Sequence, residues 1–200
     1  MAKIGIIGGT FDPIHYGHLL IAELARDSLD LERVLFVPAG DPPHKQEAEK
    51  TAVHHRCRIV ELAIEDNPAF ELSRVDLDRP GPHYSTDTVA LIRAQFDLSP
   101  DECYFIIGGD SLVDLLSWHQ PAELIQSCRL AVAHRPEYRP DVAALAETLP
   151  ALESRIDWVE LLLVEYSSSM IRRRIKAGQS IRYQTHPKVI DYLYQHGLYR

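Results

Sequence analysis

The sequence predicts an α/β protein with a doubly wound, mostly parallel sheet and helices on both of its faces. Short apolar runs alternate with segments of helical periodicity along the chain, and this alternation is typical of parallel strands joined by crossover helices. Two of the apolar runs end in glycine pairs, Gly8-Gly9 and Gly108-Gly109. Ligands of such folds bind beyond the carboxyl ends of the strands, so the glycine pairs indicate where a site lies.

The expected strands are short apolar runs that end at glycine, proline or polar residues. They cover residues 3–7, 33–37, 70–72, 103–107, 130–133 and 159–163. The run 103–107 is expected to be a central strand, because it is apolar throughout and ends at the second glycine pair. Strands of this kind, separated by helices, predict a Rossmann-like arrangement.

The expected helices carry apolar residues at intervals of three or four, which buries one helix face. They cover residues 18–29, 52–65, 85–96, a short segment that begins at Pro121, 169–177 and 187–196. Ser85 is a candidate cap for its helix, and Gly178 and Gly197 are expected to end the last two. The segment 136–157 has no clear pattern and is expected to be mostly loop.

Length and composition limit the classes of function. The chain has 200 residues, of which 46% are hydrophobic and 25% charged, and these values predict one globular domain over residues 1–200. The net charge of −8 argues against a general nucleic-acid binder, which needs a wide basic face. An anionic substrate would therefore have to be bound by local clusters of basic groups and backbone N–H groups.

The protein is expected to be cytoplasmic and to have no membrane partner. Its longest apolar runs are too short to span a bilayer, and the N-terminal run before Gly8 lacks the length and cleavage site of a signal peptide. The three cysteines, Cys57, Cys103 and Cys128, have no CxxC spacing. We expect buried free thiols in a reducing compartment rather than a disulfide or metal site.

The first glycine pair opens the segment Gly8-Gly9-Thr10-Phe11-Asp12-Pro13-Ile14-His15-Tyr16-Gly17-His18. Glycines at a strand end let the backbone approach a ligand closely, and the N-terminus of the following helix favours a phosphate. His15 and His18 would place two imidazoles at this helix mouth, where they can donate to phosphate oxygens, more strongly if protonated. A solvated turn and a two-histidine metal site are the alternatives for an isolated pair, and the preceding GGTFDP favours the phosphate.

This segment resembles the ATP-binding fingerprint of the nucleotidyltransferase superfamily, which contains an HxGH motif. The second half of that fingerprint, an ISSTxIR-like element, is matched by Tyr166-Ser167-Ser168-Ser169-Met170-Ile171-Arg172. Tyr166 replaces the aliphatic residue of the pattern, and Ser169 replaces the threonine but keeps the hydroxyl. Hydroxyls at a helix start and an arginine one turn further suit a triphosphate.

The resemblance implies that His15, His18 and Arg172 are the catalytic residues. The ATP-binding residues it implies are Gly8, Gly9, Thr10, Phe11, His15, His18, Gly108, Asp110, Ser168, Ser169 and Arg172. Among them, Gly108 and Asp110 belong to a loop that resembles the adenosine-binding loop of the family. The C-terminal part, about 165–200, is expected to be helical and to complete the ATP site.

Other stretches resemble bacterial nicotinate mononucleotide adenylyltransferases. The sequence Pro-Pro-His44-Lys45 looks like a loop of that family and presents a cationic pair for a phosphate, although a solvated proline-rich turn is the alternative. Thr86 lies where family members bind the pyridine carboxylate, and Trp118 matches a tryptophan that stacks on the pyridine ring; a structural role is the alternative for the tryptophan. Arg135 matches an arginine that contacts the mononucleotide phosphate. The implied substrate-binding residues are thus His44, Lys45, Thr86, Trp118 and Arg135.

The resemblance implies transfer of AMP from ATP to nicotinate mononucleotide, which gives deamido-NAD and pyrophosphate in NAD biosynthesis. Magnesium is expected to bind mainly through the ATP phosphates and water, without a protein metal site. The expected partners are these two small molecules and no nucleic acid, and a homo-oligomer stays open. The alternatives are another adenylyl- or cytidylyltransferase of the superfamily, with phosphopantetheine or nicotinamide mononucleotide as an acceptor, and a non-catalytic nucleotide-binding regulator.

Overall fold

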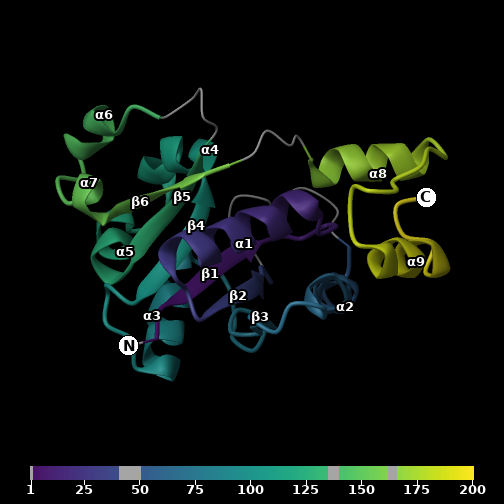
Figure 1. Ribbon diagram of the computed structural model, residues 1–200, viewed down its shortest axis with the longest axis horizontal. Coiled ribbons are helices and arrows are strands. Elements are labelled where there is room, and N and C mark those ends of the chain that lie inside the picture. The colour runs from purple at the N-terminus through teal and green to yellow at the C-terminus, as the bar shows by residue number, and fades with distance from the viewer. Residues whose placement is uncertain (1, 41–50, 135–139, 162–165) are drawn as a thin grey trace.

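The computed structural model describes residues 2–40, 51–134, 140–161 and 166–200. In these residues, six strands form one parallel sheet in the order β3-β2-β1-β4-β5-β6 (Figure 1). The strands are β1 (Ile4–Gly9), β2 (Arg33–Pro38), β3 (Phe70–Leu72), β4 (Cys103–Gly108), β5 (Arg129–His134) and β6 (Ile156–Glu160). This order is that of a doubly wound fold and confirms the predicted fold class.

The strand order reverses between β1 and β4, and the two strands separate at their carboxyl ends. β1 pairs with β2 along its whole length, from Ile4 to Gly9. Its pairing with β4 ends at Ile6, which lies opposite Phe105. An opening beyond paired central strands is the usual ligand site of this fold, and here the glycine pairs lie on its two sides.

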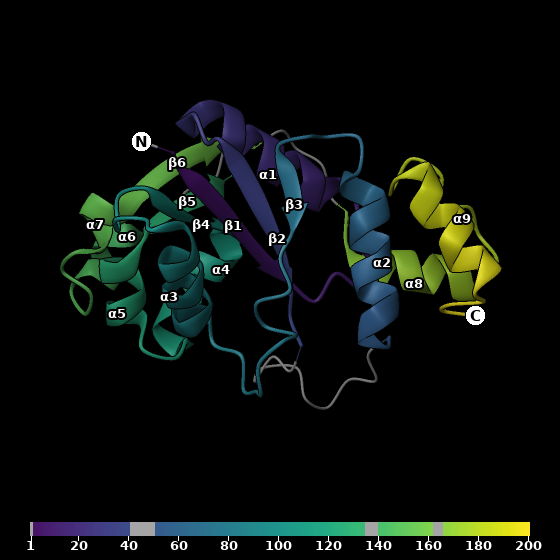
Figure 2. The same ribbon diagram turned by 90° about the horizontal axis from the view of Figure 1, so that it is seen from below.

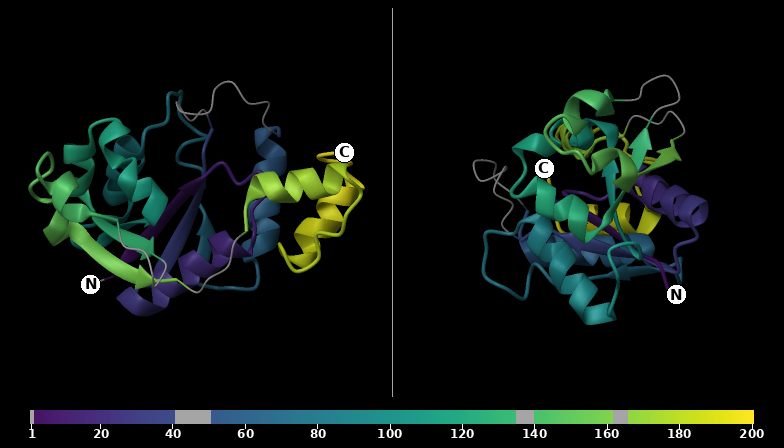
Figure 3. Two further views of the ribbon diagram at one scale, coloured as in Figure 1. Left: turned by 90° about the horizontal axis from the view of Figure 1, so that it is seen from above. Right: turned by 90° about the vertical axis from the view of Figure 1, so that its left-hand side faces the viewer.

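Helices cover both faces of the sheet, and α8 (Ser168–Lys176) and α9 (Pro187–Gln195) stand beside α2 (Val53–Ile64), away from the strands (Figures 2 and 3). One buried cluster joins the sheet to α1 (Tyr16–Leu29) and to these three helices. The other joins it to α3 (Ser85–Phe96), α4 (Gly109–Val113), η2 (Leu115–Ser117), α5 (Pro121–Ser127), α6 (Val142–Ala146) and α7 (Leu152–Arg155). Neighbouring strand residues such as Leu35 and Phe36 belong to opposite clusters, because successive side chains of a strand point to opposite faces.

The structure corrects three details of the predicted elements. α1 begins at Tyr16, two residues before the expected start, with His15 as its cap residue. Ser85 is the first residue of α3, and Tyr84 is the cap residue. β6 begins at Ile156 and ends at Glu160, whereas a strand was expected at 159–163; of those expected positions, 162 and 163 lie outside the described residues.

The segment 136–157 is less irregular than expected, because its described part contains α6 and α7. The side chain of Asp141 caps α6 and accepts hydrogen bonds from the backbone N–H groups of Ala143 and Ala144, at 3.1 and 3.4 Å. Leu145 and Leu152 are buried in the cluster on this side of the sheet. These helices are too short for a periodic pattern, and the capping aspartate was a local signal of α6 but not of α7.

Cys57, Cys103 and Cys128 are buried, as predicted, and all three are free thiols. Burial raises the pKa of the Cys103 thiol to about 12 and raises that of Cys128 further. Such thiols are chemically inert at neutral pH.

None of the helices in the described ranges is both long and apolar enough to cross a membrane.

Candidate active site

The loop between β1 and α1 lies at the opening beyond the sheet. Within it, Phe11 has a φ of 48°, a conformation that is uncommon for a bulky residue and marks a constrained site. Its buried ring packs edge-to-face on His18, with the ring centroids 5.1 Å apart, and also contacts Phe36. A Cβ on Gly9 would lie 2.9 Å from Cε1 of Phe11. Glycine is therefore required at position 9 to leave room for this ring.

His15 and His18 stack on each other at the N-terminus of α1. Their ring centroids are 3.7 Å apart and their planes differ by 22°. The backbone N–H of His15 donates a hydrogen bond to Nδ1 of His18 at 3.2 Å, so a neutral His18 carries its proton on Nε2. A Cβ on Gly17 would lie 3.0 Å from Nδ1 of His15. The glycine between the two histidines thus allows the ring of His15 to fold back over the helix.

Burial determines the charge of His15. The residue is 7% exposed, and desolvation lowers its pKa from 6.5 to about 4. Of the two states considered from the sequence, His15 is therefore in the neutral one at pH 7, in which it can offer a hydrogen bond but no charge. In the described part of the protein, no group pairs with its buried Nδ1 atom. Unpaired buried nitrogens are rare and are typical of sites that bind a ligand.

α8 brings the second predicted motif to the loop, although the two are more than 150 residues apart in the chain. The hydroxyl of Ser168 donates to the carbonyl oxygen of Pro13 at 2.9 Å. Nη1 of Arg172 donates to the carbonyl oxygen of Asp12 at 2.5 Å. Ser167 caps the helix with its hydroxyl. The two halves of the motif are therefore joined directly by hydrogen bonds.

Two adjoining cavities open at this junction. The smaller, of about 440 Å³, is bordered by both histidines, the serines at the start of α8 and Arg172. The larger, of about 470 Å³, lies between the ends of β1 and β4 and is bordered by Gly8, Gly9, Thr10, Phe11 and Gly108. His18 and Ser168 line both cavities. They therefore stand where a ligand in one cavity meets a ligand in the other.

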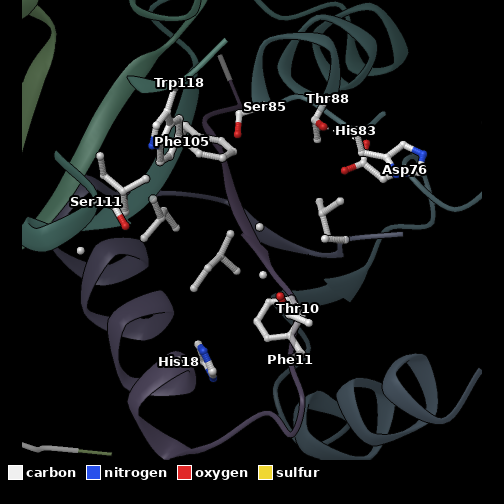
Figure 4. Close-up of a pocket in the computed structure, with 18 of the residues that line it drawn as sticks. Thr10, Phe11, His18, Asp76, His83, Ser85, Thr88, Phe105, Ser111 and Trp118 are labelled. Atoms are coloured by element: carbon white, nitrogen blue, oxygen red, sulfur yellow. Dashed lines mark hydrogen bonds between the residues drawn. The ribbon is translucent and has the colours of Figure 1, made fainter. Parts of the chain in front are cut away.

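Aromatic side chains line the far side of the larger cavity. Figure 4 shows Trp118 and Phe105 together, across the cavity from His18. The rings of Trp118 and Phe105 are perpendicular, with centroids 6.1 Å apart. Beside them, Tyr84 stacks on His119 at a centroid distance of 3.9 Å. This wall suits a flat ring, which aromatic side chains bind by stacking.

Among the predicted site residues that the structure describes, two do not line either cavity. Thr86 is buried, and its hydroxyl donates to the carbonyl oxygen of His119 at 3.0 Å. Asp110 is exposed in the first turn of α4. Ser85 and Ser111 line the larger cavity instead, because each lies one residue away and points from a different side of its helix. The predicted residues His44, Lys45 and Arg135 lie outside the described residues.

Sequence reasoning missed a polar group at the edge of the larger cavity, which Figure 4 shows beside Thr88. Asp76 is 6% exposed and accepts hydrogen bonds from the hydroxyl of Thr88 at 2.8 Å and from Nη2 of Arg79 at 3.0 Å. His83 also lines the cavity, and its ring lies so close to Gly40 that a Cβ there would come within 2.7 Å. Asp76 and Arg79 are three residues apart in the segment before α3. This spacing of opposite charges was the signal in the sequence that could have indicated the polar group.

The stacked histidines, joined to a serine–arginine helix at the switch point of a parallel sheet, are arranged as in nucleotidyltransferases. The chain belongs to the cytidylyltransferase-like family, whose model matches residues 6–174. Within it, the chain belongs with the nicotinate-nucleotide adenylyltransferases. A protein of that name from Thermomicrobium roseum is 44% identical over 200 residues, which cover 100% of this chain and 92% of the relative. One from Roseiflexus sp. is 44% identical over 199 residues, with coverages of 100% and 98%.

Solved structures of low sequence identity share the fold. The Plasmodium falciparum nicotinic acid mononucleotide adenylyltransferase complexed with NaAD superposes with a TM-score of 0.79 at 20% identity, covering 100% of this chain and 98% of that one. The same enzyme complexed with APC gives a TM-score of 0.78 at 21% identity, with the same coverages.

Proposed function

We propose that this protein transfers AMP from ATP to nicotinate mononucleotide, giving deamido-NAD and pyrophosphate. The observation that carries the proposal is the position of His18 and Ser168, which line both cavities. In a transfer between two nucleotides, the reacting phosphorus must lie where the two binding cavities meet. The names of the relatives from Thermomicrobium roseum and Roseiflexus sp. support the choice of acceptor.

The smaller cavity would hold the phosphates that leave. His15 and His18 would donate to the α- and β-phosphates, and Ser168, Ser169 and Arg172 would bind the β- and γ-phosphates. The α1 N-terminus adds the positive end of its dipole on the same side. The cavity thus combines the neutral imidazole of His15, the imidazole of His18 and one arginine, and this set of donors suits a polyanion that must also be released.

The larger cavity would hold the rest of both nucleotides. Gly8, Gly9, Thr10, Phe11 and Gly108 would contact ATP, and Ser111 would stand in for the exposed Asp110 beside the adenosine. Trp118 would stack on the pyridine ring. The start of α3, at Ser85, would direct backbone N–H groups toward the carboxylate of nicotinate, with Thr86 holding this turn in place through its bond to His119.

The reaction needs no nucleophile from the protein. An oxygen of the mononucleotide phosphate would attack the α-phosphorus in line, the new P–O bond would form, and the bond to the pyrophosphate oxygen would break. Charge then moves onto the leaving pyrophosphate, where the Nε2–H of His18 can stabilise it. Holding two polyanions in this orientation can lower the barrier by roughly 7–11 kcal/mol.

We propose that magnesium binds to the phosphates of ATP and reaches the site together with the nucleotide. The described ranges contain no group of three His, Cys, Asp or Glu side chains that could hold a metal ion. The donors around the smaller cavity are imidazoles, hydroxyls and a guanidinium, which suit phosphate oxygens and not a hard cation. The ion would therefore keep phosphate and water ligands, and it would supply charge neutralisation to the triphosphate.

We place the reaction in the cytoplasm. Three free, buried thiols fit a reducing compartment.

The test is a comparison of acceptors with the purified protein, ATP and magnesium, in which pyrophosphate release and the dinucleotide product are both measured. Nicotinate mononucleotide should give deamido-NAD, while phosphopantetheine should give no product. Product from phosphopantetheine alone would make the protein a different adenylyltransferase. ATP binding without product from any acceptor would favour a nucleotide-binding regulator.

A further inference from the structure

The loop between β1 and α1 is held in place by the last part of the chain. The hydroxyl of Thr185, which is 1% exposed, donates to the carbonyl oxygen of Ile14 at 2.7 Å. The backbone N–H of Tyr16 donates to the carbonyl oxygen of Gln184 at 3.1 Å. Buried backbone groups need such partners, so the shape of this loop depends on residues beyond the 6–174 region that the family model matches.

The second-last residue, Tyr199, reaches the same loop with its side chain. Gly197, with a φ of 62°, follows α9, and two residues later the hydroxyl of Tyr199 donates to Oδ1 of Asp12 at 2.5 Å. Desolvation, together with this hydrogen bond, raises the pKa of the Tyr199 hydroxyl far above its usual value. Tyr199 is therefore protonated at neutral pH and can donate to Asp12.

Arg56 of α2 is buried against the loop between β1 and α1 and stabilises it by hydrogen bonds. It is 2% exposed, and its guanidinium donates to the carbonyl oxygens of Thr51 at 3.0 Å and Thr10 at 2.8 Å. Desolvation lowers the pKa of Arg56, while the charge of Asp12 raises it. Arginine is almost never buried in this way without a partner, and here its partners are the loop and the segment before α2.

Asp12 connects these supports to the proposed ATP site. Asp12 is 7% exposed; its carboxylate accepts a hydrogen bond from the hydroxyl of Tyr199, and its backbone carbonyl oxygen accepts one from Nη1 of Arg172. A shift of Asp12 would therefore move both Arg172 and the segment that leads to His15. We propose that Tyr199 is a positioning residue for adenylyl transfer, acting through the Asp12 carboxylate on the geometry of this loop. The inference rests on the proposed function.

The decisive variant is Tyr199→Phe, which keeps the ring and removes only the hydroxyl. We expect kcat to fall by about 10- to 100-fold, because small misplacements of reacting groups cost this much. The matched control is Tyr194→Phe, which removes a hydroxyl from a tyrosine of α9 that is 38% exposed; its kcat should equal that of the wild type. Chemical denaturation should show both variants fully folded at the assay temperature.

A double-mutant cycle separates positioning from a general loss of stability. Asp12→Asn and Tyr199→Phe should lower kcat by less in combination than the product of their separate effects, because both break the same contact. A wild-type kcat for Tyr199→Phe, with or without a lower Tm, would overturn the proposal. Independent effects of the two substitutions would also overturn it.

A failure of the proposed function can be distinguished from a failure of the positioning role of Tyr199. If the wild type makes no deamido-NAD, the affinity for a non-hydrolysable ATP analogue, measured by calorimetry, becomes the readout. Weaker binding by Tyr199→Phe than by Tyr194→Phe would then support positioning of the phosphate-binding loop. Equal binding would contradict it.

Discussion

At the scale of single residues, the position of His18 gives the sharpest test of the proposed chemistry. His18 lines both cavities and carries its proton on the nitrogen that the His15 backbone leaves available. We expect His18→Ala to lower kcat by roughly 10²–10³, as the loss of one transition-state donor does. The exposed His54 on α2 provides the control, and His54→Ala should retain full activity. A His18→Ala variant within a few fold of wild type would show that His18 has no such role.

His15 should make the stability of the protein depend on pH. Its pKa is lowered from 6.5 to about 4, so the unfolded chain binds a proton below pH 6.5 that the folded protein excludes. The free energy of unfolding should therefore fall between about pH 6.5 and 4, by roughly 3 kcal/mol in total from this residue. Urea denaturation at several pH values should give a shallower dependence for His15→Gln. His54→Gln is the control, and equal slopes for wild type and His15→Gln would contradict the burial of a neutral ring.

At the scale of elements, α8 separates three consecutive arginines into different environments. Arg172 faces the smaller cavity and binds the carbonyl oxygen of Asp12, whereas Arg173 is exposed. Nε of Arg174 donates to the carbonyl oxygen of Ser180 at 2.8 Å. A helix with 3.6 residues per turn cannot direct three neighbours to one site.

Arg172→Ala should therefore raise the KM for ATP by about tenfold or more, since a hydrogen bond from a charged group contributes about 1.5–3 kcal/mol. Arg173→Ala is the control and should leave the KM unchanged. Arg174→Ala should lower the Tm slightly without changing the KM. Steady-state kinetics with varied ATP decide between this pattern and equal effects of all three substitutions, which would indicate a diffuse basic patch.

The starts of the helices show the limit of local patterns. Periodicity found α1 and α3, but the structure begins α1 at Tyr16 and makes Tyr84, not Ser85, the cap residue of α3. A shift by one residue rotates a helical side chain by about 100°. This is why Thr86 turns into the interior and Ser85 faces the cavity.

At the scale of the whole molecule, the larger cavity has the start of α3, at Ser85, on the side opposite His18 (Figure 4). Nicotinate carries a carboxylate where nicotinamide carries an amide, and helix N–H groups favour the anion. An amide NH₂ in the same position would face these donors unpaired, which costs about 1–3 kcal/mol for each group. We therefore expect kcat/KM to favour nicotinate mononucleotide over nicotinamide mononucleotide by at least about two orders of magnitude.

Trp118→Ala is the matched comparison for this preference. Stacking does not distinguish an acid from an amide, so the variant should lower kcat/KM for both acceptors by a similar factor. Measured side by side, near-equal rates of the wild type with the two acceptors would refute the proposed carboxylate site at α3. The ATP half of the mechanism would be unaffected by that result.

The fold class and the residues at the centre of the candidate site could be predicted from the amino-acid sequence alone. Apolar runs that end in glycine pairs depend only on neighbouring residues, and so do the HxGH segment and the serine–arginine helix start. Their roles remain predictions, but the structure places Gly8, Gly9, His15, His18, Ser168 and Arg172 around the two adjoining cavities.

Only the tertiary structure decided which buried groups support that site. The neutral state of His15, the burial of Arg56 beneath Thr10 and the contact from Tyr199 to Asp12 all depend on segments that are distant in the chain. Asp12 and Tyr199 are 187 positions apart, and no local pattern links them. Desolvation and long-range hydrogen bonds arise only once the chain has folded, so a sequence pattern of short range carries no signal of them.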